Sequence, residues 1–357
     1  MKEMTVACDV EKNRVEASRR EKLRKEKPLV YEKVLKLDEK FAAGECVAMV
    51  DITFDYACNL KCKHCSNSSF AKKNRALTVQ DLREFSNQAD QLGLCLLNIS
   101  GGEPLVFKEI DDIILALNPN KFHLSMSTNG LLLSYEKAKH LKAIGLDKIK
   151  ISVDSMDEHL HNLNRNKQGC FHKAMEALFI AREAGLDVII QHVVTRQNTQ
   201  TKETEDLAKF ATENGFMLDI INIKALGRLE GCHDVLINEE DAAFLRDLHK
   251  RYPVARRDLF PSYGIDRGCG AVNSTFQLTK YGDVLPCGYI HIAIGNIFEE
   301  TLKDIIDRGL SIKYFRNYSP KCLSGEDREF ISKYMTKFYG KPLPIHWTEA
   351  FTSEDFV

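Results

Sequence analysis

Three cysteines stand within eight residues, as Cys58, Cys62 and Cys65 in the stretch CNLKCKHC. Thiolates at this spacing can converge on one metal centre, because the intervening loop is long enough to wrap and short enough to stay local. A structural zinc site needs four ligands, and no fourth Cys or His follows at zinc-finger spacing. His64 is the nearest candidate, but it adjoins Cys65. A four-iron, four-sulfur cluster held by three thiolates leaves one iron open to a small chelating molecule.

The overall composition of the chain excludes several classes of protein. The 357 residues carry 50 basic and 51 acidic side chains, and 44% of them are hydrophobic, which excludes a disordered chain. A neutral balance argues against nucleic acid as a partner, since phosphate contacts need a basic surplus. No apolar run approaches the roughly 18 residues of a membrane span. The N-terminus lacks the apolar segment of a secretory signal. Eleven cysteines are an odd number, so we expect a cytoplasmic protein with thiols that are reduced or metal-bound.

Short β-branched runs alternate with amphipathic helical patterns between residues 47 and 223. The expected strands are 47–54, 94–100, 122–127, 148–153, 188–194 and 217–223. The expected helices are 78–92, 107–117, 134–144, 170–185 and 201–214. This order predicts parallel strands joined by right-handed crossovers. An open, partial barrel and a doubly wound sheet both fit, and periodicity alone does not choose between them.

The two flanks of this region differ from it. Opposite charges recur three and four residues apart in 11–41, which predicts one or two solvated helices interrupted at Pro28. After residue 236 we expect a helix at 239–250, a hairpin of 274–278 with 284–286, and helices at 299–308 and 326–338. The predicted divisions are a charged helical extension (1–45), the strand–helix domain (46–235), a helix with connector (236–261) and a small C-terminal domain (262–357).

Polar motifs follow the expected strands in a specific order. Ser100–Pro104 (SGGEP) follows the second strand, the STNG motif at 127–130 the third, and Ser152 and Asp154 end the fourth. Together with the cysteine loop they resemble the radical S-adenosylmethionine (radical SAM) superfamily over roughly residues 48–230. The resemblance implies a partial (β/α)6 TIM-type barrel and a catalytic 4Fe-4S cluster on Cys58, Cys62 and Cys65.

The same resemblance implies a binding site for S-adenosylmethionine at the carboxyl ends of the strands. The glycines would let backbone carbonyls approach the ligand closely, and a carboxylate favours its ammonium group. The residues that correspond to the family's cofactor contacts are His64, Gly101, Gly102, Glu103, Pro104, Asn129, Ser152, Asp154, Arg165, Gln191 and Asn198.

A second cysteine group, Cys269, Cys287 and Cys322, lies in the C-terminal domain. Its arrangement around the hairpin resembles the SPASM and shorter twitch extensions of the superfamily, which implies a small α+β unit with one auxiliary iron–sulfur cluster, a 4Fe-4S cluster by analogy. The sequence does not identify a fourth ligand for this cluster. Three alternatives remain: an open iron that binds substrate, Cys232 as the fourth ligand, or a non-cysteine ligand, for which His291, Glu326 and Asp327 are the candidates.

The resemblance implies that reductive cleavage of S-adenosylmethionine yields a 5′-deoxyadenosyl radical, which abstracts a hydrogen atom from the substrate. We expect a peptide or natural-product precursor, with a small-molecule dehydrogenase or epimerase acting on an aminocyclitol, sugar or nucleotide as the alternative. An electron donor such as flavodoxin or ferredoxin is an expected partner. Cys232 and Cys170 are candidate hydrogen-atom donors. A competing hypothesis is a zinc- or cluster-binding scaffold without turnover.

Overall fold

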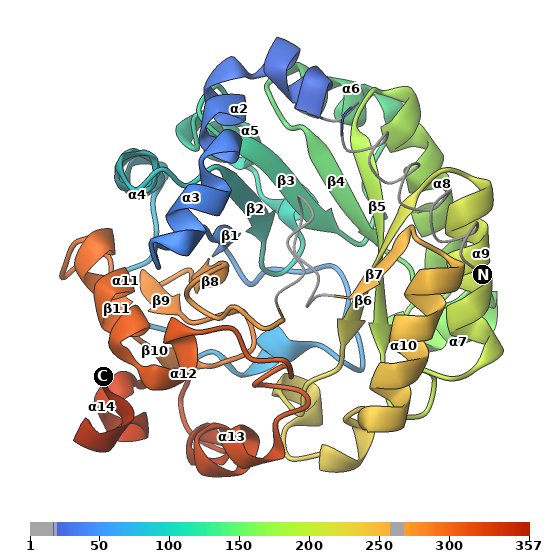
Figure 1. The fold of residues 1–357 in the computed structure, drawn as a ribbon. Coiled ribbons are helices and arrows are strands. Elements are labelled where there is room, and N and C mark those ends of the chain that lie inside the picture. Colours follow the sequence, from blue (N-terminus) through green and yellow to red (C-terminus); the bar gives the residue numbers. More distant parts are fainter. Residues whose placement is uncertain (1–16, 18–19, 258–267) are drawn as a thin grey trace.

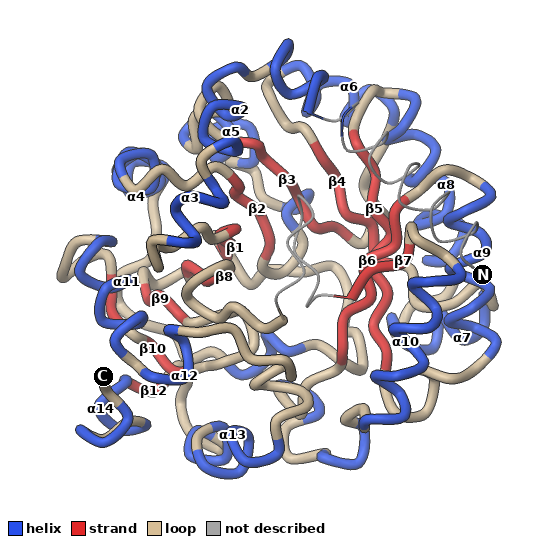
Figure 2. The backbone as a smooth tube through the Cα atoms, viewed as in Figure 1, coloured by secondary structure: helices blue, strands red, loops and turns tan. Residues whose placement is uncertain are grey.

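A computed structural model describes residues 17, 20–257 and 268–357. The strands of its main sheet are β1 (Met49–Thr53), β2 (Leu96–Ser100), β3 (His123–Thr128), β4 (Lys148–Ser152), β5 (Asp187–Val194), β6 (Met217–Asn222), β7 (Ala255–Arg257), β8 (Thr275–Leu278), β9 (Asp283–Leu285) and β11 (Gly295–Asn296). They are arranged in the order β11-β9-β8-β1-β2-β3-β4-β5-β6-β7, and the pairs from β1 to β6 are all parallel (Figure 2). The predicted parallel α/β fold is confirmed. Within the described residues the sheet is an open, curved wall, as expected for a partial barrel.

Helices connect the parallel strands and cover the outer face of this wall (Figure 1). They are α4 (Val79–Gln91), α5 (Ile110–Ala116), α6 (Tyr135–Ala143), α7 (Glu158–Arg165), α8 (Cys170–Glu183) and α9 (Lys202–Glu213). Helix α4 shows why the sequence folds this way locally: Thr78 and Asp81 form a capping box, and Leu82 and Phe85 are buried against the sheet. The sequence patterns placed all of these helices except α7, which is short and largely polar.

The inner face of the wall is polar, because the strands alternate in character. In β4 the apolar Ile149 and Ile151 are fully buried, whereas Lys148, Lys150 and Ser152 line an internal cavity. The barrel interior is therefore a chamber and not a packed apolar core.

The N-terminal extension differs from its prediction. Helices α2 (Pro28–Leu35) and α3 (Leu37–Ala42) pack on the barrel, and Val30 and Val34 are buried in a cluster with Cys95. Residues 20–26 are helical and Pro28 begins the next helix, where its fixed φ angle is favourable, so the predicted interruption is confirmed. The predicted exposure holds for the ion pairs of Glu21 with Arg24 and Lys25. It was wrong for α2, which is buried at Val30 and Val34, and for Lys27, which contacts backbone carbonyls of the barrel.

Lys27 shows this docking most clearly. Its Nζ donates to Phe122 O (3.0 Å) and Gly145 O (3.2 Å) and lies 2.5 Å from Asp147 Oδ2. These acceptors lie at the amino ends of β3 and β4. The extension thus covers the end of the barrel opposite the predicted cofactor site.

The C-terminal residues extend the barrel sheet. β8 and β9 form the predicted antiparallel hairpin, and β8 also pairs in parallel with β1. β7 lies inside the predicted connector and pairs with β6. A second sheet contains β10 (Ile292–Ala293) and β12 (Ile345–His346). The remaining helices are α10 (Glu239–Arg251), α11 (Leu302–Ser311), α12 (Lys313–Arg316), α13 (Arg328–Lys333) and α14 (Trp347–Ala350). None of the helices in the described part of the chain is long and apolar enough to cross a bilayer.

Candidate active site

A cavity of about 1210 Å³ follows the inner face of the sheet and reaches both cysteine groups. The predicted site residues that line it are Cys58, Cys62, Cys65, Cys269, Cys287, Cys322, His64, Gly101, Gly102, Glu103, Asn129, Ser152, Arg165 and Gln191. Side chains from positions 58 to 322 thus meet around one space. One continuous cavity therefore connects the two cysteine groups.

The first cysteine group, Cys58, Cys62 and Cys65, is held by backbone hydrogen bonds, and none of the three forms a disulfide. Leu60 N donates to Cys58 Sγ at 3.4 Å, and Arg228 N donates to Cys65 O at 3.1 Å. A loop of three cysteines at the cavity wall has the donor chemistry that an iron–sulfur cluster requires.

The SGGEP motif packs directly on this loop. Gly102 N donates to Asp55 O at 2.9 Å, and Glu103 N donates to Ala57 O at 2.8 Å. A Cβ atom on Gly102 would lie 2.0 Å from Ala57 O, so only glycine fits. The close approach that the sequence attributed to a ligand is therefore made, in the described structure, to the cysteine loop itself.

The Glu103 carboxylate joins the ends of β2 and β3. It is 1% exposed and accepts from Thr128 Oγ1 (2.5 Å), Asn129 N (2.7 Å) and Leu105 N (3.1 Å). Burial raises the pKa of Glu103, although the hydrogen bonds from Asn129, Thr128 and Leu105 oppose the shift. This arrangement fixes Asn129, whose Nδ2 donates to Asn59 Oδ1 in the cysteine loop at 2.8 Å.

Asp154 and Arg165 form a buried ion pair, with Nη2 2.6 Å from Oδ1. Burial alone would raise the pKa of Asp154, but Arg165, with His64 and His161, lowers it to about 2. Arg165 Nε and Asp154 Oδ2 are buried without a hydrogen-bond partner. Arg165 lines the cavity and Asp154 does not, so Asp154 acts on the site through the arginine. An unsatisfied guanidinium N–H beside the cysteine loop fits a ligand with a carboxylate.

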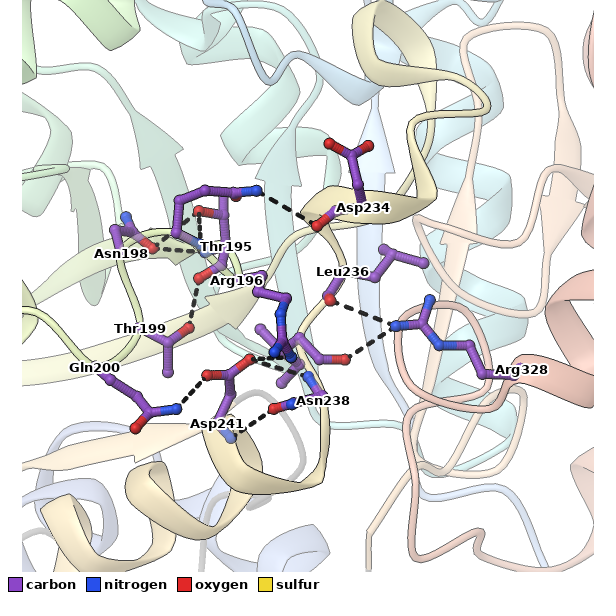
Figure 3. Close-up of polar contacts among 12 residues, drawn as sticks. Thr195, Arg196, Asn198, Thr199, Gln200, Asp234, Leu236, Asn238, Asp241 and Arg328 are labelled. Carbon is purple, nitrogen blue, oxygen red and sulfur yellow. Dashed lines mark hydrogen bonds and ion pairs between the residues drawn. The ribbon is translucent and has the colours of Figure 1, made fainter.

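Besides Asp154, four predicted site residues do not line the cavity. Asn198 was expected near the adenosine, but its Oδ1 accepts from Thr195 N (2.6 Å) and its Nδ2 donates to Val193 O, so it closes the turn after β5 (Figure 3). Pro104 is buried at the start of a short 3-10 turn. Cys170 is 1% exposed, and its Sγ lies 3.2 Å from Asn162 Oδ1. Cys232 is half-buried outside the cavity lining.

The second cysteine group is also held by backbone hydrogen bonds. Cys269 pairs through its backbone with Ser319, with N–O distances of 2.7 and 3.0 Å. The neighbouring Cys322 thiol, followed by burial, raises the pKa of Cys269, and burial raises that of Cys287 to about 12. Buried thiols this close together ionise only beside a compensating positive charge, which the iron of a cluster supplies.

The candidates for a fourth ligand lie away from the cavity lining. Glu326 Oε2 accepts from Arg257 Nη2 (2.6 Å) and from Cys322 N (3.1 Å), and Asp327 caps α13. His291 packs between Phe70 and Phe338, with ring centroids 4.7 and 5.7 Å away. None of these side chains lines the cavity together with the cysteines. No three His, Cys, Asp or Glu residues in the described part of the chain converge closely enough for a single metal ion.

Sequence reasoning missed the polar residues of the barrel interior. Lys150, Asp51, Asn98 and Gln277 all line the cavity from the middle of their strands. The signal was present in KIKIS at 148–152, where polar side chains alternate with isoleucines in a strand covered by helices. A strand buried in a parallel sheet normally reads as continuously apolar.

Comparison with known proteins agrees with this geometry. The model of the radical SAM superfamily matches residues 52–211, and that of the SPASM iron–sulfur cluster-binding domain matches 269–325. Residues 52–211 form a radical SAM domain. Its second cysteine group lies within the SPASM match, and its parallel sheet is the framework that carries the first.

Relatives of this radical SAM protein have diverse names. The AdoMet-dependent heme synthase of Nitratidesulfovibrio vulgaris is 24% identical over 299 residues, covering 74% of this chain and 81% of the relative. The mycofactocin maturase MftC of Mycolicibacterium smegmatis is 31% identical over 198 residues, covering 55% and 50%. SuiB of Streptococcus suis, solved with its precursor peptide SuiA, has a TM-score of 0.59 at 19% identity, covering 77% of this chain and 69% of SuiB. The chain is thus a radical SAM enzyme, and its cofactors are 4Fe-4S clusters and S-adenosylmethionine.

Proposed function

We propose that this enzyme reductively cleaves S-adenosylmethionine and abstracts a hydrogen atom from a peptide or natural-product precursor, with the help of one auxiliary iron–sulfur cluster. The supporting observation is the single cavity of about 1210 Å³ that both cysteine groups line. A chamber of this volume accepts a side chain or a short segment of a peptide.

In this proposal Cys58, Cys62 and Cys65 hold the catalytic cluster, and Cys269, Cys287 and Cys322 hold the auxiliary one. When reduced, the catalytic cluster with S-adenosylmethionine supplies the 5′-deoxyadenosyl radical. The chain positions the reactants and excludes water. Since none of Cys232, His291, Glu326 and Asp327 lines the cavity with the three cysteines, the proposal gives the auxiliary cluster an open iron.

The residues at the strand ends bind the cofactor. Arg165 offers its unsatisfied Nε–H to the carboxylate of the methionine moiety, and Asp154 holds the guanidinium in place. The backbone of Gly101 and Gly102 lies beside the ammonium group. Ser152 and Gln191, neighbours in the register of β4 and β5, face the ribose and the adenine.

The peptide class has support from the names of relatives, since SuiB was solved with a precursor peptide and MftC is a maturase. A small-molecule substrate is the second candidate. It has support from the heme synthases, which align over 74% and 75% of this chain, more than the maturase does.

We also propose that the electron comes from a flavodoxin or ferredoxin in the cytoplasm, where the thiols of both cysteine groups stay reduced until they bind iron. We propose, too, that new domains of the chain begin at residues 46, 236 and 262.

Anaerobic reconstitution followed by iron analysis tests the cluster assignment. We expect about eight irons per chain, in two four-iron clusters. Replacing the first cysteine group with alanine should leave about four irons and no 5′-deoxyadenosine, and replacing the second group should also leave about four. About four irons in the unmodified chain would reject the auxiliary cluster. Production of 5′-deoxyadenosine that sugars or nucleotides stimulate, and peptides do not, would favour the second candidate.

A further inference from the structure

Lys150 is a buried cation inside the barrel with no anionic partner in contact. It lies in the middle of β4, is 7% exposed and lines the cavity. Its Nζ has Met49 Sδ at 3.8 Å, and a thioether is a weak acceptor. Among the described residues no carboxylate lies within ion-pair distance of this ammonium group.

The carboxylate of Asp51, which acts on Lys150 electrostatically, already has a hydrogen-bond partner. Asp51, on β1, attracts Lys150 electrostatically without touching it, and Asn98 Nδ2 donates to Asp51 Oδ1 at 2.6 Å. Asn98 is itself held by Ser125, whose Oγ donates to Asn98 Oδ1 at 2.7 Å. This network holds Asp51, and Lys150 lines the same cavity without forming an ion pair with it.

Other charged groups of the interior do not supply an anionic partner for Lys150. Asp219 and Arg256 are register neighbours on β6 and β7, and Asp187 forms an ion pair with Lys22. Lys148 adds a second ammonium group to the cavity lining on the same strand.

We propose that Lys150 binds an anionic group of the substrate, a carboxylate or a phosphate, inside the barrel. This inference rests on the proposed function, because it names the chemistry of the molecule that occupies the same cavity. A buried ammonium group without a partner is costly, and a ligand oxyanion is the group that satisfies it. For a peptide substrate, the anion is the carboxylate of an acidic side chain or of the C-terminus.

The test uses the reconstituted enzyme with S-adenosylmethionine and two matched probes, Ac-Ala-Glu-Ala-NH2 and Ac-Ala-Gln-Ala-NH2, with inorganic phosphate as a third. The measurement is the midpoint of thermal unfolding, which requires no turnover. We expect the glutamate probe to raise Tm by about 2 °C or more, and the glutamine probe to have a smaller effect. A larger shift with phosphate would assign the anion to a phosphorylated ligand.

Two variants locate the effect. In Lys150→Met the difference between the probes should disappear, and in Lys150→Arg it should persist. Lys121→Met removes a surface lysine that pairs with Asp90 outside the cavity and should keep the wild-type difference.

Equal responses to the two peptides in the wild type, together with no response to phosphate, would overturn the inference. So would a difference between the peptides that survives in Lys150→Met. Failure of the proposed function is read separately, from the absence of 5′-deoxyadenosine in the wild type.

Discussion

Arg165 connects the end of β4 to the first cysteine group: its Nη2 lies 2.6 Å from Asp154 Oδ1, and its Nη1 lies 3.9 Å from Cys62 Sγ. Both charged side chains are buried, so the position of each depends on the other. Asp154 follows the strand directly, whereas Arg165 ends the helix after it. A strand end and a short helix together aim one guanidinium at the cavity.

The first prediction concerns this pair. Asp154→Asn leaves Arg165 as a buried charge without its carboxylate, which should lower the free energy of unfolding by about 3 kcal/mol. The freed guanidinium should also bind S-adenosylmethionine more weakly. Denaturant unfolding and calorimetric titration with the cofactor measure the two effects. Asp206→Asn, which breaks an exposed pair with Lys202, is the matched control and should change neither quantity. Unchanged cofactor affinity in Asp154→Asn would contradict the positioning role.

The second prediction concerns the contact between the SGGEP motif and the cysteine loop. In Gly102→Ala the new methyl group would meet Ala57 O at 2.0 Å, so the loop must move and the first cysteine group loses its geometry. We expect the variant to retain about half of its iron and to release no 5′-deoxyadenosine.

Gly288→Ala is the control for this substitution. It adjoins Cys287 in the second group, but its Cβ would meet only ordinary contacts, at 3.7 Å or more from Gln277. Neither glycine has a positive φ angle, so the two variants differ in steric contact alone. Full iron content in Gly102→Ala would show that the loop tolerates displacement.

Much of the barrel could be predicted because its signals are local. Each predicted strand from β1 to β6 lies within two residues of the observed one at either end, since β-branched runs and terminal glycines mark the boundaries. The short β7 could not be predicted, because its pairing with β6 depends on tertiary contact. The docking of α2 could not be predicted either: a charge pattern is the same whether a lysine meets water or, as Lys27 does, a backbone carbonyl.

The residues of the candidate site also divide into those that local sequence signals place and those that only tertiary structure places. Glu103 follows the end of β2, and Arg165 is held by Asp154 after the end of β4. Both motif positions therefore line the cavity. Asn198 was misplaced, since a polar residue after a strand closes a turn as readily as it meets a ligand. Lys150 was missed, because no motif contains it and its importance comes from the hollow interior.

The third prediction concerns the N-terminal extension. Lys27→Met leaves Asp147 as a buried charge at the amino end of the barrel, which should cost about 3–5 kcal/mol of unfolding free energy. The double variant Lys27→Met/Asp147→Asn should lose less than the sum of the two single variants. Urea unfolding of the four proteins measures the coupling. Lys25→Met, which breaks an exposed pair with Glu21, should cost less than about 1 kcal/mol. Additive losses would show that the extension is not anchored through this pair.

The fourth prediction concerns the two cysteines that the sequence offered as hydrogen-atom donors. Since Cys170 and Cys232 both lie outside the cavity lining, Cys170→Ser and Cys232→Ser should keep the iron content and the turnover of the wild type. Serine can preserve the contact of Cys170 with Asn162, so the first variant should also fold normally. The measurement is product formation in D2O, with deuterium content read by mass spectrometry. If either serine variant binds full iron and releases 5′-deoxyadenosine but loses the deuterated product, that cysteine reaches the substrate by a movement of its loop.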